Sequence, residues 1–82
     1  MDGLSALGRV PIPRQSYLDA CQSLGFVYGR RRWRSHDGQR LYEWDDLHGE
    51  IEVYNRRGKH LGVLDPVGNM ISDAVPGRTI DV

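Results

Sequence analysis

Residues 40–54 read RLYEWDDLHGEIEVY, and this stretch decides the fold. Side chains alternate between the two faces of a β-strand, so apolar residues at every second position indicate a strand with one buried face. Two such runs, 40–45 and 49–54, are separated by a short polar turn. We therefore expect two antiparallel strands here. Their inward residues would be Tyr42, Trp44, Ile51 and Val53.

The period of two continues on both sides of this pair. Turn residues separate the runs, most clearly at Asp37-Gly38, a pair that hairpin loops favour, and in the segment 55–58. Strands joined by short loops usually lie side by side, so we expect one highly twisted antiparallel sheet. The further short strands would cover residues 26–28, 31–34, 59–64 and 70–72.

The segment before these strands has a helical period instead. We expect a short amphipathic helix over residues 15–24, with Gly25 as its stop signal. Ser16 and Asp19 have the spacing of a capping box and offer an alternative start. We interpret Cys21 as a small core residue rather than a reactive thiol. The apolar face of this helix would carry Tyr17, Ala20, Cys21 and Leu24.

These elements predict a single domain of the α+β class that is mainly β, with the short N-terminal helix packed on the sheet. A chain of 82 residues suits one domain with a modest core. Residues 1–25 would form a tail and the helix, and residues 26–82 the sheet. The single cysteine excludes an internal disulfide and a multi-thiolate zinc site. We expect no membrane segment, since no apolar run has the required length, and no signal peptide.

The charge of the chain is balanced in total but uneven along its length. A net charge of zero by itself argues against a nucleic-acid-binding domain. Residues 1–41, however, hold seven Arg and three acidic residues, whereas residues 42–82 hold four basic and eight acidic ones. The chain thus runs from a net charge of +4 to one of −4. Such a distribution can give a basic surface opposite an acidic one.

The basic half contains an arginine-rich run at residues 29–34, and ten of the eleven basic residues are Arg. Arginine contacts phosphate in a bidentate way, which favours RNA binding. Positive charge also deters pairing at the edge of a sheet, so a solvated edge strand is an equally good interpretation. Trp33 within the run could stack on a base or anchor the sheet. The candidate RNA-binding residues are Arg30, Arg31, Arg32, Arg34, Arg40, Tyr54 and Lys59.

The densest cluster of reactive side chains lies between Asp45 and Glu52. On a straight strand His48 and Glu52 share a face about 13 Å apart, at about 3.3 Å per residue, so a twist or a bend at Gly49 must bring them around one phosphate. Asp45 lies three residues before His48 across a turn and can fix its tautomer. Transesterification of RNA needs a base, an acid and a cation. Glu52, His48 and an arginine would supply them.

Two other interpretations of this cluster exist, and the first, a purely structural one, stays open. Glu50 and Glu52 fit the solvent face of a half-buried strand, with His48 in a turn. A metal site would need further ligands, and His36 and His60 lie on other expected elements, so we expect no bound metal and no cofactor.

A longer series of residues resembles a known family. Its core is YEWDDLHGEIE, in which the Tyr-Glu-Trp-Asp and His-Gly-Glu-x-Glu segments are separated by two residues. Such a run resembles the cytotoxic ribonuclease domain of cloacin and the rRNA-cleaving E-group colicins, over about residues 31–80, and is more specific than a short motif. Further matching positions are Arg32, Trp33, Asp37, Gly38, Tyr54, Gly58, His60, Leu61, Gly62, Asp65 and Pro66.

The resemblance implies a metal-independent endoribonuclease that cuts the decoding-site RNA of the small ribosomal subunit and halts translation. The family's essential Asp, His and Glu correspond to Asp45, His48 and Glu52, its tail arginine corresponds to Arg78, and Glu50 would support them. The roles of His48 and Glu52 as acid and base could be exchanged. The implied partners are the bacterial ribosome and an acidic immunity protein that binds the domain, which would otherwise be a monomer. It would be delivered into a target cell and act in the bacterial cytoplasm.

Three features depart from the family. The family domain is strongly basic and Lys-rich, whereas this chain is neutral. Residues 17–24 show no similarity to it. These 82 residues contain no counterpart of the receptor-binding and translocation regions of a colicin, so an excised toxin module, the tip of a contact-delivered effector and a free-standing homologue are all compatible with the sequence. A second class of function therefore stands beside the enzyme: a catalytically inactive RNA- or protein-binding module with the same sheet.

Overall fold

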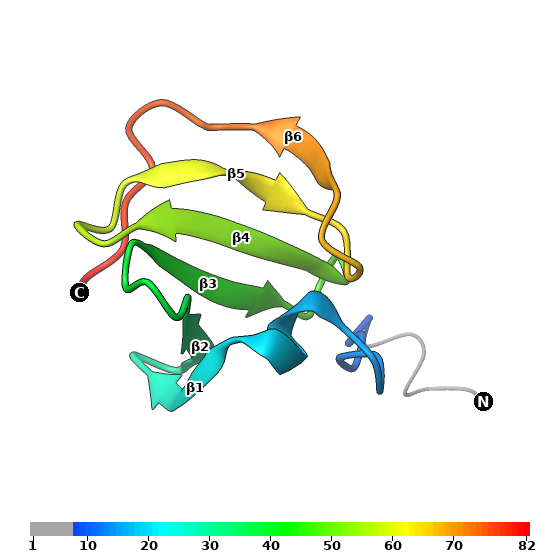
Figure 1. Cartoon of the computed structure of the whole chain (residues 1–82). Helices are drawn as coiled ribbons and strands as arrows, with labels where there is room; N and C mark the ends of the chain where they lie inside the picture. Colours follow the sequence, from blue (N-terminus) through cyan, green and yellow to red (C-terminus); the bar gives the residue numbers. More distant parts are fainter. Residues whose placement is uncertain (1–7) are drawn as a thin grey trace.

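The computed structural model describes residues 8–82; residues 1–7, part of the expected tail, lie outside the described residues. It shows one antiparallel sheet in which every strand pairs with its neighbours in sequence (Figure 1). The strands are β1 (Gln22–Val27), β2 (Arg30–Arg34), β3 (Arg40–Asp45), β4 (Glu50–Asn55), β5 (His60–Leu64) and β6 (Met70–Asp73).

The pair β3–β4 forms the centre of the sheet, as the sequence predicts. Its register runs without a shift from Arg40 opposite Asn55 to Asp45 opposite Glu50. The expected inward residues all belong to one apolar core beneath the sheet. This core consists of Leu18, Trp33, Tyr42, Trp44, Ile51, Val53 and Leu64, with Ile12, Cys21 and Leu61 packed against it.

The expected helix over residues 15–24 is wrong. Only a single 3-10 turn forms, at Tyr17–Ala20, and it does have the Ser16–Asp19 capping box. The chain then becomes extended at Cys21 and enters β1, which pairs with β2 from Gln22 to Val27. Ladder hydrogen bonds to a neighbouring strand outweigh a weak helical period in so short a segment. The fold is therefore mainly β, without a helix packed on the sheet among residues 8–82.

The second face of the sheet is also buried in its centre, which the alternation did not predict. Glu52 is only 7% exposed, and Glu43 only 4%. The C-terminal tail after β6 returns along the loop end of the β4–β5 hairpin (Figure 1), and from there Arg78 reaches Glu52. The tail is held there by a bridge between Lys59 and Thr79 and by the Ile80 amide, which donates to the Gly58 carbonyl. We call the two sides of the sheet the apolar face and the polar face.

Within residues 8–82, no helix reaches the length and apolar character that a membrane span requires.

Candidate active site

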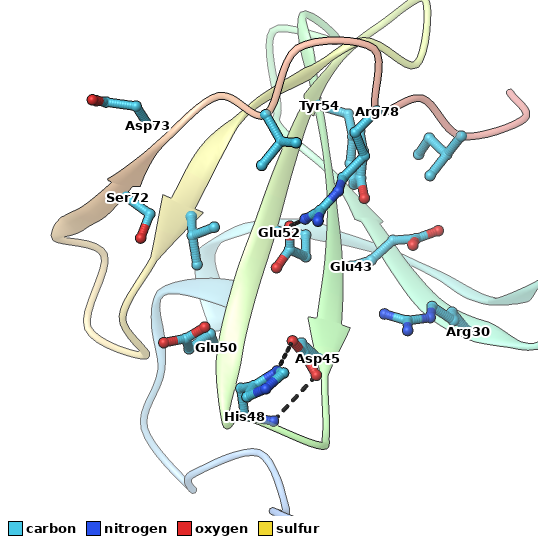
Figure 2. A pocket seen from close by; sticks show the side chains of 13 residues that line it. Arg30, Glu43, Asp45, His48, Glu50, Glu52, Tyr54, Ser72, Asp73 and Arg78 are labelled. Atoms are coloured by element: carbon cyan, nitrogen blue, oxygen red, sulfur yellow. Dashed lines mark hydrogen bonds and ion pairs between the residues drawn. The ribbon is translucent and has the colours of Figure 1, made fainter.

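A cleft of about 570 Å³ opens on the polar face (Figure 2). Side chains from β2 to β5 form its floor, β6 borders one side, and the C-terminal tail closes one end. The charged and polar residues that line it are Arg30, Glu43, Asp45, His48, Glu50, Glu52, Tyr54, Ser72, Asp73 and Arg78.

The Asp45–His48 pair occupies one end of the cleft, where β3 turns into β4. The Asp45 Oδ2 atom lies 2.8 Å from Nδ1 of His48. Asp45 Oδ1 accepts hydrogen bonds from the backbone amides of Leu47 and His48 at 3.0 and 3.2 Å, and Gly49 takes the positive φ that closes the turn. The contact between Asp45 and His48 that the spacing predicts is thus formed. Because Nδ1 is bound, Nε2 is the ring nitrogen left for a substrate.

This pairing shifts both titrations. The hydrogen bond from Asp45, and then its negative charge, raise the pKa of His48 above its usual value of 6.5. Partial burial works to raise the pKa of Asp45, but the bonds from the His48 ring and the turn amides outweigh it, and that pKa is lowered. Both shifts favour the ionised carboxylate and the protonated imidazole, which is the form of His48 that can donate a proton.

A second group of bonded side chains surrounds Glu52 in the middle of the cleft. His60 Nε2 lies 2.7 Å from Glu52 Oε1, and Arg78 Nη1 donates to the same oxygen at 3.2 Å. Figure 2 shows Arg78 descending from the tail onto Glu52. Within residues 8–82 no hydrogen bond involves Glu52 Oε2, so this oxygen remains for a substrate.

The hydrogen bonds of His60 assign its tautomer. Its side chain is fully buried, and Nδ1 accepts the backbone N–H of Val75 at 2.9 Å. An atom that accepts cannot carry the proton, so the proton is on Nε2, which donates to Glu52. His60 was not among the expected site residues. The turn at residues 55–58 could have indicated His60, because it predicts that the strand carrying His60 returns alongside the strand that carries Glu52.

His48 and Glu52 line the same cleft but make no bond to each other, and each has its own set of partners. Glu50 lies on the His48 side. Ligand atoms of Asp45, His48 and Glu50 all fall within 4.8 Å of one another, a spacing that could hold a metal ion. The expected signal of a metal site was a second histidine, so this set was missed; its ligands come from the end of β3, the turn after it and the start of β4.

The expected RNA-binding arginines lie in different environments on the sheet. Arg32 is 4% exposed, and its guanidinium makes two bonds to Glu43, at 2.9 and 3.2 Å. This burial against Glu43 does not favour the expected phosphate contact of Arg32, which stays a prediction. Arg30 lines the cleft. Arg31 stacks over Trp33, 4.9 Å from the ring centre, and Trp33 belongs to the core, as the anchoring interpretation predicts.

The remaining candidates lie in different places. Arg40 borders a hollow with Tyr42 on the apolar face, away from the cleft. Arg34 and Lys59 are exposed. Tyr54 lines the cleft but is 4% exposed, with its ring edge-on to His60 at 5.2 Å. The basic side chains therefore do not form one continuous surface around the site.

Comparison with known proteins gives one consistent result. A family model described as Cytotoxic matches residues 22–81. Colicin E3 of Escherichia coli is 45% identical over 53 residues, which make up 62% of this chain and 10% of colicin E3. Colicin-E6 is 43% identical over 53 residues, which make up 62% of this chain and 10% of colicin-E6. Cloacin is 42% identical over 53 residues, which make up 62% of this chain and 9% of cloacin. Both are also from Escherichia coli. The chain spans about a tenth of the length of these relatives.

Proposed function

Because the chain belongs to the Cytotoxic domain family, with colicin E3, colicin-E6 and cloacin among its homologues, we propose that it is an endoribonuclease toxin. Its substrate is the small-subunit ribosomal RNA at the decoding site, and its cleavage halts translation. The observation that carries this proposal is the cleft itself. It presents a carboxylate oxygen on Glu52 and a ring nitrogen on His48, each held by its own partners and each left unbonded toward the substrate.

The reaction is a transesterification at one phosphodiester. Glu52 Oε2 removes the proton of the ribose 2′-OH, and the 2′-oxygen forms a bond to phosphorus. The bond from phosphorus to the 5′-oxygen breaks, and His48 Nε2 gives its proton to that oxygen. The products are a 2′,3′-cyclic phosphate and a 5′-hydroxyl. Asp45 keeps His48 charged and oriented before the transfer.

Arg78 stabilises the negative charge that develops on the phosphorane. Only one of its guanidinium donors is used by Glu52, and its side chain is 45% exposed at the end of the cleft. The other donors are free to contact phosphate oxygens. His60 acts through Glu52 and is a positioning residue, since it is buried and cannot reach a substrate.

The acid and base assignments can be separated with a substrate whose leaving group needs no proton. A bridging 5′-phosphorothiolate RNA should restore much of the rate to His48→Ala, because its thiolate leaves unprotonated. It should not restore the rate to Glu52→Gln. Rescue of Glu52→Gln alone would show that the two roles are exchanged.

The function is tested by adding the purified chain to bacterial ribosomes. One discrete fragment from near the 3′ end of the small-subunit RNA is expected, and none from the matched His48→Ala variant. Intact RNA after prolonged incubation with the native chain, together with ribosome binding, would instead support the catalytically inactive binding module.

We further propose that cleavage needs no metal ion, because Glu52, His48 and Arg78 supply the base, the acid and the cation. The Asp45, His48 and Glu50 cluster makes a test necessary. A short model RNA should be cut at the same rate in excess EDTA. Loss of cleavage in EDTA and its return with a divalent ion would contradict metal independence. A short RNA avoids the magnesium that ribosomes need for their own integrity.

The ribosome and an acidic immunity protein remain the proposed partners, and the cytoplasm of a target bacterium the proposed place of action. The family membership and the exposed arginines support these assignments. Sedimentation of the purified chain alone should show a monomer. A stable dimer would contradict that expectation.

A further inference from the structure

The loop between β1 and β2 contains an unusual residue for its conformation. Val27 pairs with Arg30, so only Tyr28 and Gly29 form the loop, and both have positive φ, 52° and 83°. Two-residue hairpin loops with positive φ at both positions favour Asn, Asp or Gly. A bulky residue there costs conformational free energy. Tyr28 is the only described non-glycine residue with positive φ, and 76% of it is exposed, so packing does not explain its presence.

The Tyr28 ring borders a hollow that continues the catalytic cleft. Arg30, Glu43 and Ile80 line both the cleft and this hollow, so the two lie next to each other. The other wall is the C-terminal tail that also carries Arg78. The hollow is lined by Tyr28, Arg30, Arg32, Glu43, Thr79, Ile80 and Asp81.

The charges of the hollow favour a neutral, planar group over a second phosphate. Arg32 and Glu43 neutralise each other in their buried ion pair. Asp81 contributes a carboxylate, which repels phosphate and can accept a hydrogen bond from an amino group. Arg30 makes no ion pair with any other residue of 8–82, and it stands where the hollow meets the cleft.

We propose that Tyr28 forms a stacking subsite for an unpaired nucleobase next to the scissile phosphate, with Arg30 on the phosphate that connects the two. This inference rests on the proposed ribonuclease function and deepens it. An aromatic ring stacks on any base, because every base has a π-face, and arginine beside it contacts the backbone. The strained loop is then a position where the ring serves binding rather than stability.

Phe26 provides a matched control two residues away. Its exposed fraction is 75%, nearly equal to that of Tyr28. It borders a different hollow, with Arg31 and Trp44, which shares only Arg30 with the cleft. A general tendency of exposed aromatic rings to bind RNA would affect both residues, whereas a subsite at the cleft requires only Tyr28.

The test measures binding of a fluorescent single-stranded RNA oligonucleotide by anisotropy, with all variants made on His48→Ala to prevent cleavage. Tyr28→Asn should weaken binding by about 5- to 150-fold, the range found for single base-stacking contacts. Tyr28→Phe should bind as the parent does, and Phe26→Asn within about twofold of it. Asn suits the loop, so the melting temperature of Tyr28→Asn should be unchanged or higher. Arg30→Ala should make the slope of log affinity against log salt shallower by about one, and Tyr28→Asn should leave it unchanged.

Cleavage of ribosomal RNA by the native chain, measured in parallel, keeps the two proposals separate. Cleavage together with equal RNA affinity of Tyr28→Asn and its parent overturns the subsite and leaves the ribonuclease standing; the exposed ring would then suit a protein partner. Equal losses for Tyr28→Asn and Phe26→Asn also overturn it. Weaker binding by Tyr28→Asn without any cleavage by the native chain supports the subsite and overturns the enzyme. Absence of both binding and cleavage overturns both.

Discussion

The two faces of the sheet are built from alternate residues of the same strands, and both are buried in the centre, but for different reasons. On the apolar face, Ile51 and Val53 pack into the core. On the polar face, Glu43 and Glu52 are buried by the C-terminal tail and arginine partners. Among residues 8–82 every buried side-chain polar atom has a hydrogen-bond partner.

The two faces are therefore stabilised in different ways. The apolar face is stabilised by the removal of hydrocarbon from water, an effect that depends little on the direction of each contact. The polar face holds each group through directed bonds, and such a network costs free energy whenever one member is missing. Changes on the apolar face should therefore affect stability, and changes on the polar face should affect function, stability or both according to which bonds they remove.

The largest expected effect is on the rate of cleavage. His48→Ala and Glu52→Gln should each lower the single-turnover rate by about 10²- to 10⁴-fold, as for other positioned acids and bases. Ribosome binding should persist, because these groups act mainly in the transition state. Asp73→Asn is the matched control, since Asp73 lines the cleft without a hydrogen bond to its side chain within residues 8–82. Native rates in both active-site variants would refute the site.

The next largest effect concerns the buried ion pair of the polar face. Arg32→Met should lower the free energy of unfolding by about 3–5 kcal/mol, because it leaves the Glu43 carboxylate buried and unpaired. The double variant Arg32→Met/Glu43→Leu should recover most of this loss, since it removes both charges. Urea denaturation gives both values. If the double variant is no more stable than the single one, the loss of stability does not come from an unpaired buried carboxylate, and the prediction is wrong.

The apolar face should respond in stability alone. Ile51 is fully buried, so Ile51→Ala should lower the free energy of unfolding by about 2–5 kcal/mol. Its cleavage rate, measured well below the melting temperature, should match that of the native chain. A lower rate in the folded variant would show that the two faces are mechanically coupled through β4.

The two hydrogen bonds of His60 can be tested separately. Asn at this position keeps an acceptor for the Val75 amide and loses the donor to Glu52. A hydrogen bond to a charged group contributes about 1.5–3 kcal/mol, so His60→Asn should slow cleavage by about 10- to 100-fold. Hydrogen exchange at Val75 should remain slow. His60→Gln should show the opposite pattern, with fast exchange and a smaller loss of rate; if both variants lose only stability, His60 has no positioning role.

The smallest expected effect is the pH dependence of the Asp45–His48 pair. The pKa of His48 is raised from 6.5, so its contribution to stability is complete below that pH and disappears as the pH rises through the folded value. The pKa of Asp45 is lowered from 3.8, so its contribution is present above that pH and disappears as the pH falls. His48 is exposed, and solvent screening keeps the total small. The melting temperatures of the native chain and His48→Ala should differ most near pH 5 and converge toward pH 9; a gap that widens with pH would refute the pairing.

The sequence predicted the apolar face of the sheet well and the burial on the polar face poorly. The period of two at Tyr42, Trp44, Ile51 and Val53 was sufficient for the central pair of strands, because burial on one face acts on every second residue. It could not predict burial of Glu52, which depends on a tail more than twenty residues later. The contact between Asp45 and His48 was predictable since it is local.

The failures also have a physical cause. The helical period of residues 15–24 was too short to compete with the ladder of β1 and β2. His60 lies eight residues from Glu52, and its contact depends on the register after the turn, where the β4–β5 ladder shifts between Val53 and Tyr54. The burial of Arg32 against Glu43 depends on the register that places them opposite each other on β2 and β3. The number of charges along the sequence does not reveal that register. Family resemblance supplied Arg78, which no local pattern distinguishes from other arginines.

The late position of the tail along the chain has a consequence for the cell that makes the protein. During synthesis, Asp45, His48 and Glu52 leave the ribosome before Val75 and Arg78, which complete the hydrogen bonds of His60 and Glu52. A nascent chain that stops between these points carries the proposed acid and base without the tail groups that bond to His60 and Glu52. We therefore expect the site to be assembled only after the tail has been translated.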